Sequence, residues 1–170
     1  MNKTSIFLLL GSILFLFNCS GETDKNIYES AKQNLAGEKY PEALIEFEEL
    51  VTKYPKSEYY QEALLQTGEL YQGHVNKDIP YEVSLKKAIN SYRLFNSKFP
   101  KDSKSPQTLF MIGFIQANNL GELDSAKATY QKYIELYPES EMAESAQSEI
   151  ENLGLTPDEI LTKKIQNTPE

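Results

Sequence analysis

Residues 88–100 read AINSYRLFNSKFP, and two further stretches, ALIEFEELVTKYP at 43–55 and AKATYQKYIELYP at 126–138, carry the same landmarks. Each stretch begins with alanine, has an aromatic residue four positions later and a large apolar residue seven positions later, and ends in an aromatic residue followed by proline. These positions share one face of an α-helix, and proline ends the helix because it lacks an N–H group and clashes with the preceding turn. The three stretches therefore predict three equivalent helices, each with one buried face.

A second kind of helix is expected after each proline. Ser57, Asp102 and Ser140 each stand two residues beyond a proline, where their side chains can accept hydrogen bonds from the free N–H groups of a new helix. Gly68 and Gly113 follow at equal distances from the preceding prolines, and residues this small let two helices approach closely. We expect helices at about 25–36, 41–53, 58–72, 82–97, 104–119, 123–136 and 141–152. The predicted packing residues are Ala43, Phe47, Pro55, Gly68, Ala88, Tyr92, Pro100, Gly113, Ala126, Tyr130 and Pro138.

These helices predict an all-α fold. One antiparallel pair cannot bury its own apolar face, so the pairs are expected to stack side by side as an α-solenoid. The pattern resembles the tetratricopeptide repeat, which has its small residue, aromatic residue and terminal proline at these offsets. The prolines stand 45 and 38 residues apart, further than in that family, because the first helices are longer and residues 73–83 add a loop. The resemblance implies about three and a half repeats in one domain, residues 25–152.

The N-terminus has the features of an export signal. Lys3 precedes a run of roughly 12 apolar residues, short of the ~20 that span a bilayer as a helix, and the chain's single cysteine follows directly. This resembles a bacterial lipoprotein signal, which implies a signal peptide at 1–18, lipidation of Cys19 and a tether at 19–24. Several acyl chains on one cysteine would hold the protein at a membrane. The alternative is a secretory signal cleaved elsewhere, with an unmodified thiol.

The C-terminal segment, residues 153–170, predicts a short capping helix and a tail. Thr156 and Glu159 form a capping box, with Pro157 at the first helical position. The apolar residues of this helix, Ile160, Leu161 and Ile165, would cover the exposed end of the stack. A frayed, disordered tail is the alternative.

Composition and motifs argue against several functions. A net charge of −8 disfavours nucleic-acid binding, and one histidine with one cysteine leaves no ordinary metal site. No phosphate-binding glycine motif is present, and His74 is interpreted as a loop residue. The acidic residues at 42–49 are best explained as the solvent-exposed face of a helix. We therefore expect a protein that is not an enzyme, with no cofactor, no metal and no small-molecule substrate.

The resemblance implies a partner-binding groove lined by the first helix of each pair. Its positions in this sequence are Tyr28, Lys32, Glu62, Leu65, Glu69, Gln72, Gln107, Phe110, Phe114 and Asn118. Leu65 and Phe110 could equally be core residues. Phe114 directly follows Gly113, so its side chain should point away from the close helix contact, and we hypothesise that Phe114 and Glu69 contact a partner. The segment 74–81 is a second candidate surface, although loops accept insertions at little cost.

The longer helices and the junctions YPKS at 54–57 and YPES at 137–140 look like an envelope subgroup of tetratricopeptide proteins that includes the outer-membrane assembly lipoprotein BamD. This resemblance implies a lipid-anchored scaffold on the bacterial outer membrane, facing the periplasm, that takes part in β-barrel protein assembly. Its partners would be other envelope proteins or peptides. The alternatives are a general periplasmic adaptor, such as the division-linked repeat proteins of the Tol-Pal system, and display on the cell surface.

Overall fold

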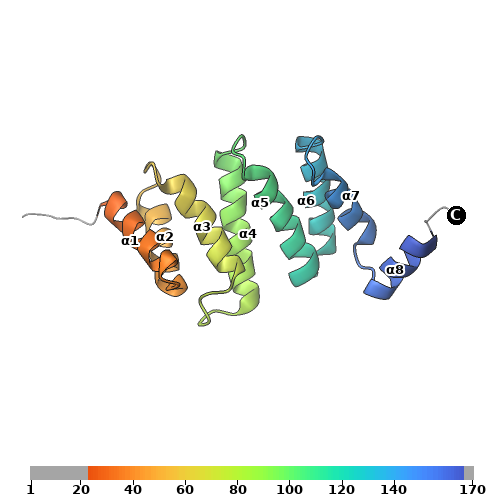
Figure 1. Cartoon of the computed structure of the whole chain (residues 1–170), viewed down its shortest axis with the longest axis horizontal. Helices are drawn as coiled ribbons and strands as arrows, with labels where there is room; N and C mark the ends of the chain where they lie inside the picture. Colours follow the sequence, from red (N-terminus) through yellow and green to blue (C-terminus); the bar gives the residue numbers. More distant parts are fainter. Residues whose placement is uncertain (1–22, 167–170) are drawn as a thin grey trace, which may run out of the picture.

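The computed structural model describes residues 23–166, in which the helices follow one another along an elongated stack (Figure 1). The described residues contain no β-strand, and the predicted all-α solenoid is confirmed. Three antiparallel hairpins, α1–α2, α3–α4 and α5–α6, are followed by α7 and α8. The elements are α1 (Asp24–Ala36), α2 (Tyr40–Lys53), α3 (Tyr60–Gln72), α4 (Tyr81–Lys98), α5 (Ser105–Phe114), the π-helical turn η1 (Ile115–Asn119), α6 (Leu123–Leu136), α7 (Ala143–Asn152) and α8 (Pro157–Gln166).

The repeated landmarks form the core of the stack. The alanines and aromatic residues of the second helices are fully or almost fully buried: Ala43, Phe47, Ala88, Tyr92, Ala126 and Tyr130. Gly113 of α5 lies against the Tyr130 ring, and a Cβ atom at Gly113 would lie 2.8 Å from Tyr130 Cε1. Burying one such large side chain contributes about 1.5–3 kcal/mol, so the aromatic residues hold each hairpin together. The small residues are required because the aromatic rings fill the space beside them.

The junctions between hairpins repeat the same geometry. A side-chain oxygen accepts a hydrogen bond from the backbone N–H two residues later in each junction: Ser57 from Tyr59 at 3.1 Å, Asp102 from Lys104 at 2.7 Å and Ser140 from Met142 at 3.3 Å. The exposed prolines Pro55, Pro100 and Pro138 precede these three turns. These bonds lie in the turns, because the helices α3, α5 and α7 begin one residue later and have no side-chain cap. The predicted acceptors therefore order the turn before each helix and do not cap the helix itself.

Two loops depart from a plain helical turn. The helix expected over 104–119 is regular only to Phe114 and ends in η1, where Leu120 N–H bonds to Ile115 O at 3.1 Å. Gln116 in this turn is buried, and its Oε1 accepts from Thr129 of α6 at 2.7 Å. His74, in a left-handed conformation with φ of 49°, closes the loop before α4 through Nε2 and the Ile79 carbonyl oxygen, 2.9 Å apart.

The capping prediction is correct for the helix and wrong for its packing. Thr156 N–H donates to Glu159 Oε2 at 2.7 Å, and Glu159 N–H donates to Thr156 Oγ1 at 3.3 Å, so the capping box forms and α8 begins. Leu161 and Ile165, however, are 58% and 67% exposed, because α8 lies off the end of the stack (Figure 1). Of the residues predicted to cover the end, only Ile160 is partly buried. The last helix packed on the stack is α7, which contacts α6 and whose exposed residues are polar.

The predictions for the signal peptide at 1–18, for Cys19 and for most of the tether fall outside the described residues. Asp24, assigned to the tether, instead begins α1, and Thr23 caps that helix through a 3.2 Å hydrogen bond from Asn26 N–H. None of the described helices combines the length and the apolar character needed to cross a membrane.

Candidate partner-binding groove

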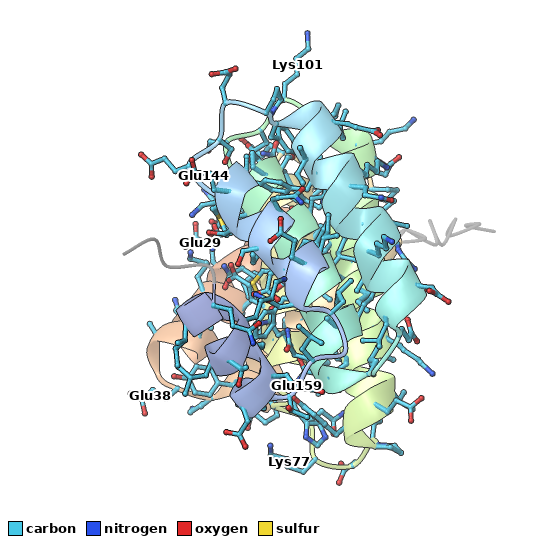
Figure 2. All side chains as sticks on the ribbon, turned by 90° about the vertical axis from the view of Figure 1, so that its right-hand side faces the viewer. Glu29, Glu38, Lys77, Lys101, Glu144 and Glu159 are labelled. Atoms are coloured by element: carbon cyan, nitrogen blue, oxygen red, sulfur yellow. The ribbon has the colours of Figure 1, made fainter. Side chains whose placement is uncertain are left out.

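The first helices of the hairpins lie on one side of the stack, which we call the groove face. Seen from the C-terminal end, α7 lies to the left of α6, and Glu29 of α1 and Glu144 of α7 are on that same left side (Figure 2). The groove face thus comprises the outward sides of α1, α3, α5 and α7. The opposite side, formed by α2, α4 and α6, we call the back face.

Three predicted groove residues meet between the first two hairpins. Tyr28 OH donates to Glu62 Oε2 at 2.6 Å, and Lys32 Nζ donates to Glu62 Oε1 at 2.6 Å. The Tyr28 ring stacks on Tyr59 with centroids 4.3 Å apart. Burial, with the bond to Glu62, raises the pKa of Tyr28 to about 12. Burial opposes ionisation of Glu62, but the bonds from Lys32 and Tyr28 outweigh it and lower the Glu62 pKa.

A hollow of about 340 Å³ lies between α3 and the start of α5. Leu65 and Phe95 provide its apolar surface, and it is otherwise lined by Glu58, Gln61, Glu62, Asp102, Ser103 and Lys104. Gln61 Nε2 donates to Asp102 Oδ2 at 2.6 Å and ties α3 to the turn before α5. Tyr59, Gln61 and Lys104 were not predicted as groove residues, because their position depends on how one hairpin is set against the next. The sequence does place these residues close to Ser57 and Asp102, the acceptors that follow each proline, and this position could have indicated them.

The two aromatic residues predicted in the third repeat have different environments. Phe110 is 8% exposed, with its ring edge-to-face against Tyr130 and Tyr133 at centroid distances of 5.2 and 5.8 Å. The assignment of Phe110 to the groove is therefore wrong, and it is a core residue. Phe114, one turn later, is 37% exposed. Leu65 is intermediate, because it packs partly against the core and partly lines the hollow.

The polar residues predicted for the groove also differ, since some are accessible and one supports the packing of its hairpin. Glu69 is exposed, bonded to Gln66 at 2.9 Å, and desolvation by its surroundings raises its pKa although Lys104 and Gln66 oppose this. Gln72 accepts a 2.7 Å hydrogen bond from Tyr92 OH, so it supports the packing of the hairpin.

The other two polar positions lie in the third repeat. Gln107 and Asn118 are both exposed, and Asn118 bonds back to the Phe114 carbonyl at 3.3 Å. We therefore place Glu69, Gln107 and Asn118 among the accessible groove residues.

The resulting surface is suited to binding. Around α3 and the start of α5, the carboxylates Glu58, Glu62, Glu69 and Asp102 outnumber the amino groups of Lys32 and Lys104. Apolar contact is available at Leu65 and Phe114, and an apolar centre inside a polar rim is the usual form of an interaction hot spot. Among residues 23–166, no three His, Cys, Asp or Glu side chains are placed to hold a metal ion.

The fold defines a helical-repeat protein, with a hollow between α3 and the start of α5. Residues 107–140, which cover most of α5 and all of η1 and α6, match the tetratricopeptide repeat. The matched segment contains Gly113, Ala126, Tyr130 and Pro138. The second hairpin repeats all four landmarks, and the first repeats them with Ala31 in place of the glycine and Phe47 as the aromatic residue. No curated protein matches the chain. Tetratricopeptide repeats generally mediate interactions between proteins and are generally scaffolds without catalytic activity.

Proposed function

We propose that this protein is a non-enzymatic scaffold in the bacterial envelope, held at the outer membrane by a lipid on Cys19 and facing the periplasm. Its groove face binds a segment of another envelope protein. The observation that carries the proposal is the exposure of Phe114, on the same helix on which Phe110 is buried in the core. An aromatic ring kept at the surface of a repeat groove is a natural anchor for a partner.

The chemistry of the groove indicates what the partner segment contains. Glu69 and Phe114 each directly follow the glycine at which their hairpin packs, so they hold equivalent positions in consecutive repeats. A partner side chain that is apolar can cover Phe114, while a basic or hydrogen-bond-donating group can approach Glu69. Desolvation already disfavours the ionised form of Glu69, and a cation bound beside it would restore that form.

Participation in β-barrel outer-membrane protein assembly, as in the BamD group, is our preferred role within this class. The long helices and the tyrosine-proline junctions support it. A general periplasmic adaptor, such as the Tol-Pal-linked repeat proteins, is the second candidate. The number of repeats favours it, because three hairpins and α7 offer a shorter surface than the repeats of the BamD group.

Affinity purification from membranes tests the proposal. Wild-type protein would be compared with Cys19→Ala, which cannot be lipidated, and with Phe114→Ala, which keeps the anchor and loses the groove ring. We expect Cys19→Ala to leave the membrane fraction and Phe114→Ala to remain there without its partner. Barrel-assembly subunits among the co-purified proteins would support the preferred role, and division or cell-wall proteins the second. Recovery of the same proteins with Phe114→Ala would refute the groove assignment.

A further inference from the structure

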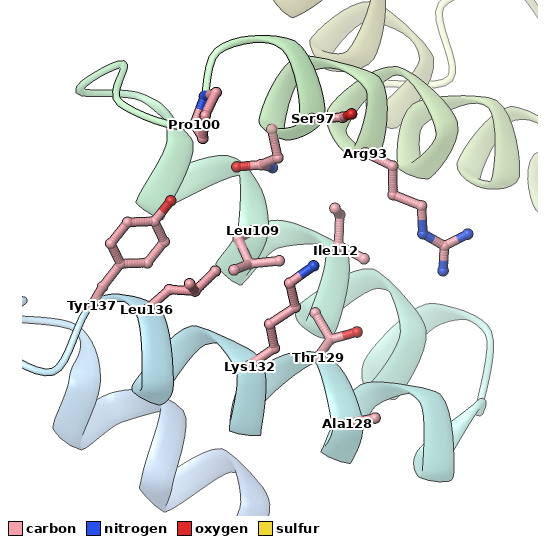
Figure 3. A pocket seen from close by; sticks show the side chains of 11 residues that line it. Arg93, Ser97, Pro100, Leu109, Ile112, Ala128, Thr129, Lys132, Leu136 and Tyr137 are labelled. Atoms are coloured by element: carbon pink, nitrogen blue, oxygen red, sulfur yellow. The ribbon is translucent and has the colours of Figure 1, made fainter.

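The back face carries a second hollow, between α4, α5 and α6. Its volume is about 470 Å³, and its floor is formed by Leu109 and Ile112 of α5 (Figure 3). Leu136 of α6 extends the apolar surface and is 54% exposed. Lys132 of α6 extends toward the apolar floor, and Arg93 of α4 lies at the edge of the hollow (Figure 3). An apolar floor with polar groups at its edge is the general form of a binding pocket.

The preceding junction, between the first and second hairpins, is bridged by side chains. There Glu48 of α2 accepts a short hydrogen bond from Tyr71 OH, and Lys87 of α4 donates to the same hydroxyl at 2.6 Å. These contacts link α2 to α4 across α3. We call the junction between two successive hairpins a seam. The first seam is thus closed by the carboxylate of Glu48, the hydroxyl of Tyr71 and the amino group of Lys87.

Equivalent positions in consecutive repeats show which residues replace this bridge in the second seam. Glu48 and Arg93 both stand five residues after the first alanine of their helix, so a cation occupies the position of the acid. The position of Tyr71 is taken by Gln116, which is turned inward to Thr129, and that of Lys87 by Ser125. The second seam therefore has no equivalent bridge and is open, and of these three positions only Arg93 lines the hollow.

The charges around the open seam are unbalanced. Neither Arg93 nor Lys132 makes an ion pair or hydrogen bond with any of residues 23–166, and no acidic side chain lines the hollow. Glu122 lines a neighbouring hollow together with Arg93 and Lys86. Two cations at the edge of a hollow that no acidic side chain lines contrast with the net charge of −8 of the chain. They favour an anionic occupant.

We propose that this seam is a docking site for an acidic segment of a partner protein, separate from the groove face. A carboxylate of the segment lies between Arg93 and Lys132, and a neighbouring leucine or phenylalanine side chain enters the hollow over Leu109 and Ile112. The site goes beyond the proposed groove function because it faces the opposite side and selects the opposite charge. The two faces could then hold two partners at once.

The test uses fluorescence anisotropy with the full chain and a fluorescein-labelled, glutamate-rich peptide that contains one leucine and one phenylalanine. The disrupting variant is Arg93→Glu with Lys132→Glu. The matched control is Lys101→Glu with Lys127→Glu, which changes the net charge equally at two exposed residues outside the hollow. Phe114→Ala serves as a second control for the groove face. Circular dichroism checks that every variant keeps its helices.

We expect the disrupting variant to weaken peptide binding by about tenfold or more, because two favourable charge contacts become repulsive. A tenfold change corresponds to about 1.4 kcal/mol of binding free energy. The charge-matched control and Phe114→Ala should bind the peptide within about twofold of wild type. A peptide with serine at both apolar positions should bind more weakly.

Several results would overturn the proposal. Equal losses in the two double variants would show a non-specific charge effect, and full binding of the serine peptide would show that the hollow is not filled. Absence of peptide binding would equally reject it. So would a wild-type dimer that the disrupting variant converts to monomer, because the occupant would then be a second copy. Loss of binding in Phe114→Ala alone would move the site to the groove face.

Discussion

Gly68 of α3 lies directly beneath the ring of Tyr92 of α4: a Cβ atom at Gly68 would lie 2.5 Å from Tyr92 Cε1 and 2.7 Å from Cδ1. No real Cβ contact is this short, and Tyr92 is buried and bonded to Gln72, so its ring cannot move aside. The same relationship joins Gly113 to Tyr130 in the next hairpin. In the second and third hairpins, the distance between the two helices is set by an aromatic ring packed on a glycine.

Replacing this glycine should therefore destabilise the stack. We expect Gly68→Ala to lower the free energy of unfolding by about 1–3 kcal/mol, the usual cost of overfilling a packed core. Gly73→Ala is the control, because its nearest neighbours would lie at 3.5 Å or more and its φ is −68°. Urea denaturation followed by circular dichroism measures both. Equal stability of Gly68→Ala and wild type would contradict the packing described here.

The two aromatic residues of α5 should respond in opposite ways to truncation. Phe110→Ala removes a buried ring in contact with Tyr130 and should cost about 3–5 kcal/mol. Phe114→Ala removes a partly exposed ring and should cost about 1 kcal/mol or less, while it abolishes partner capture. Thermal unfolding and pull-down of the two variants, run in parallel, separate the roles. A strongly unstable Phe114→Ala would make Phe114 a structural residue.

Glu62 should couple stability to acid pH. Its pKa in the folded protein is below the reference value of 4.5, so its ionised form stabilises the fold above about pH 4.5, and this contribution is lost as the pH falls through the lowered value. Glu62→Gln should lower stability by about 1 kcal/mol at neutral pH, since the group is only partly buried, and the difference should vanish in acid.

Melting temperatures between pH 3 and pH 7 measure this coupling. Glu139→Gln is the control, because Glu139 is exposed and forms no ion pair with another of the described residues. A Glu62→Gln variant that differs from wild type equally at both ends of the range would show that the carboxylate charge is not what stabilises the contact.

Removal of α8 should have little effect on the stack. Leu161 and Ile165 are mostly exposed, and Lys163 makes only a 3.0 Å bond to the Glu151 carbonyl and a 3.9 Å ion pair with the same residue. In a chain ending at residue 155, the free energy of unfolding should change by about 0.5 kcal/mol or less, and the melting temperature should shift correspondingly little. A drop of several kcal/mol would mean that α8 does cap the stack in solution.

Much of the fold was predictable from the sequence because the helix period turns residue spacing into geometry. Ala88, Tyr92 and Pro100 place one buried face and one helix end, and their recurrence gives three hairpins. The direction of α8 was not predictable in the same way. Gly154, with φ of +78°, turns the chain away from the stack after α7, and no periodic pattern reports such a turn.

The groove was predictable only in part. Counting from Gly68 and Gly113 located Glu62, Glu69 and Phe114 on the accessible surface, but the same count placed Phe110 there too. Phe110 is buried because Tyr130 and Tyr133 of α6 close over it, a contact between hairpin partners that one helix's spacing does not contain. The seam on the back face depends likewise on three helices, and no motif signals it.

The most direct measurement of the central claim is site-specific photocrosslinking in living cells. A photoreactive phenylalanine analogue at Phe114 would report on the groove face, and the same analogue at Ile45, an exposed residue of α2, on the back face. We predict one dominant crosslinked envelope protein from position 114 that is absent from position 45. The same product from both positions, or none from position 114 in protein that is folded and at the membrane, would contradict a partner-binding groove.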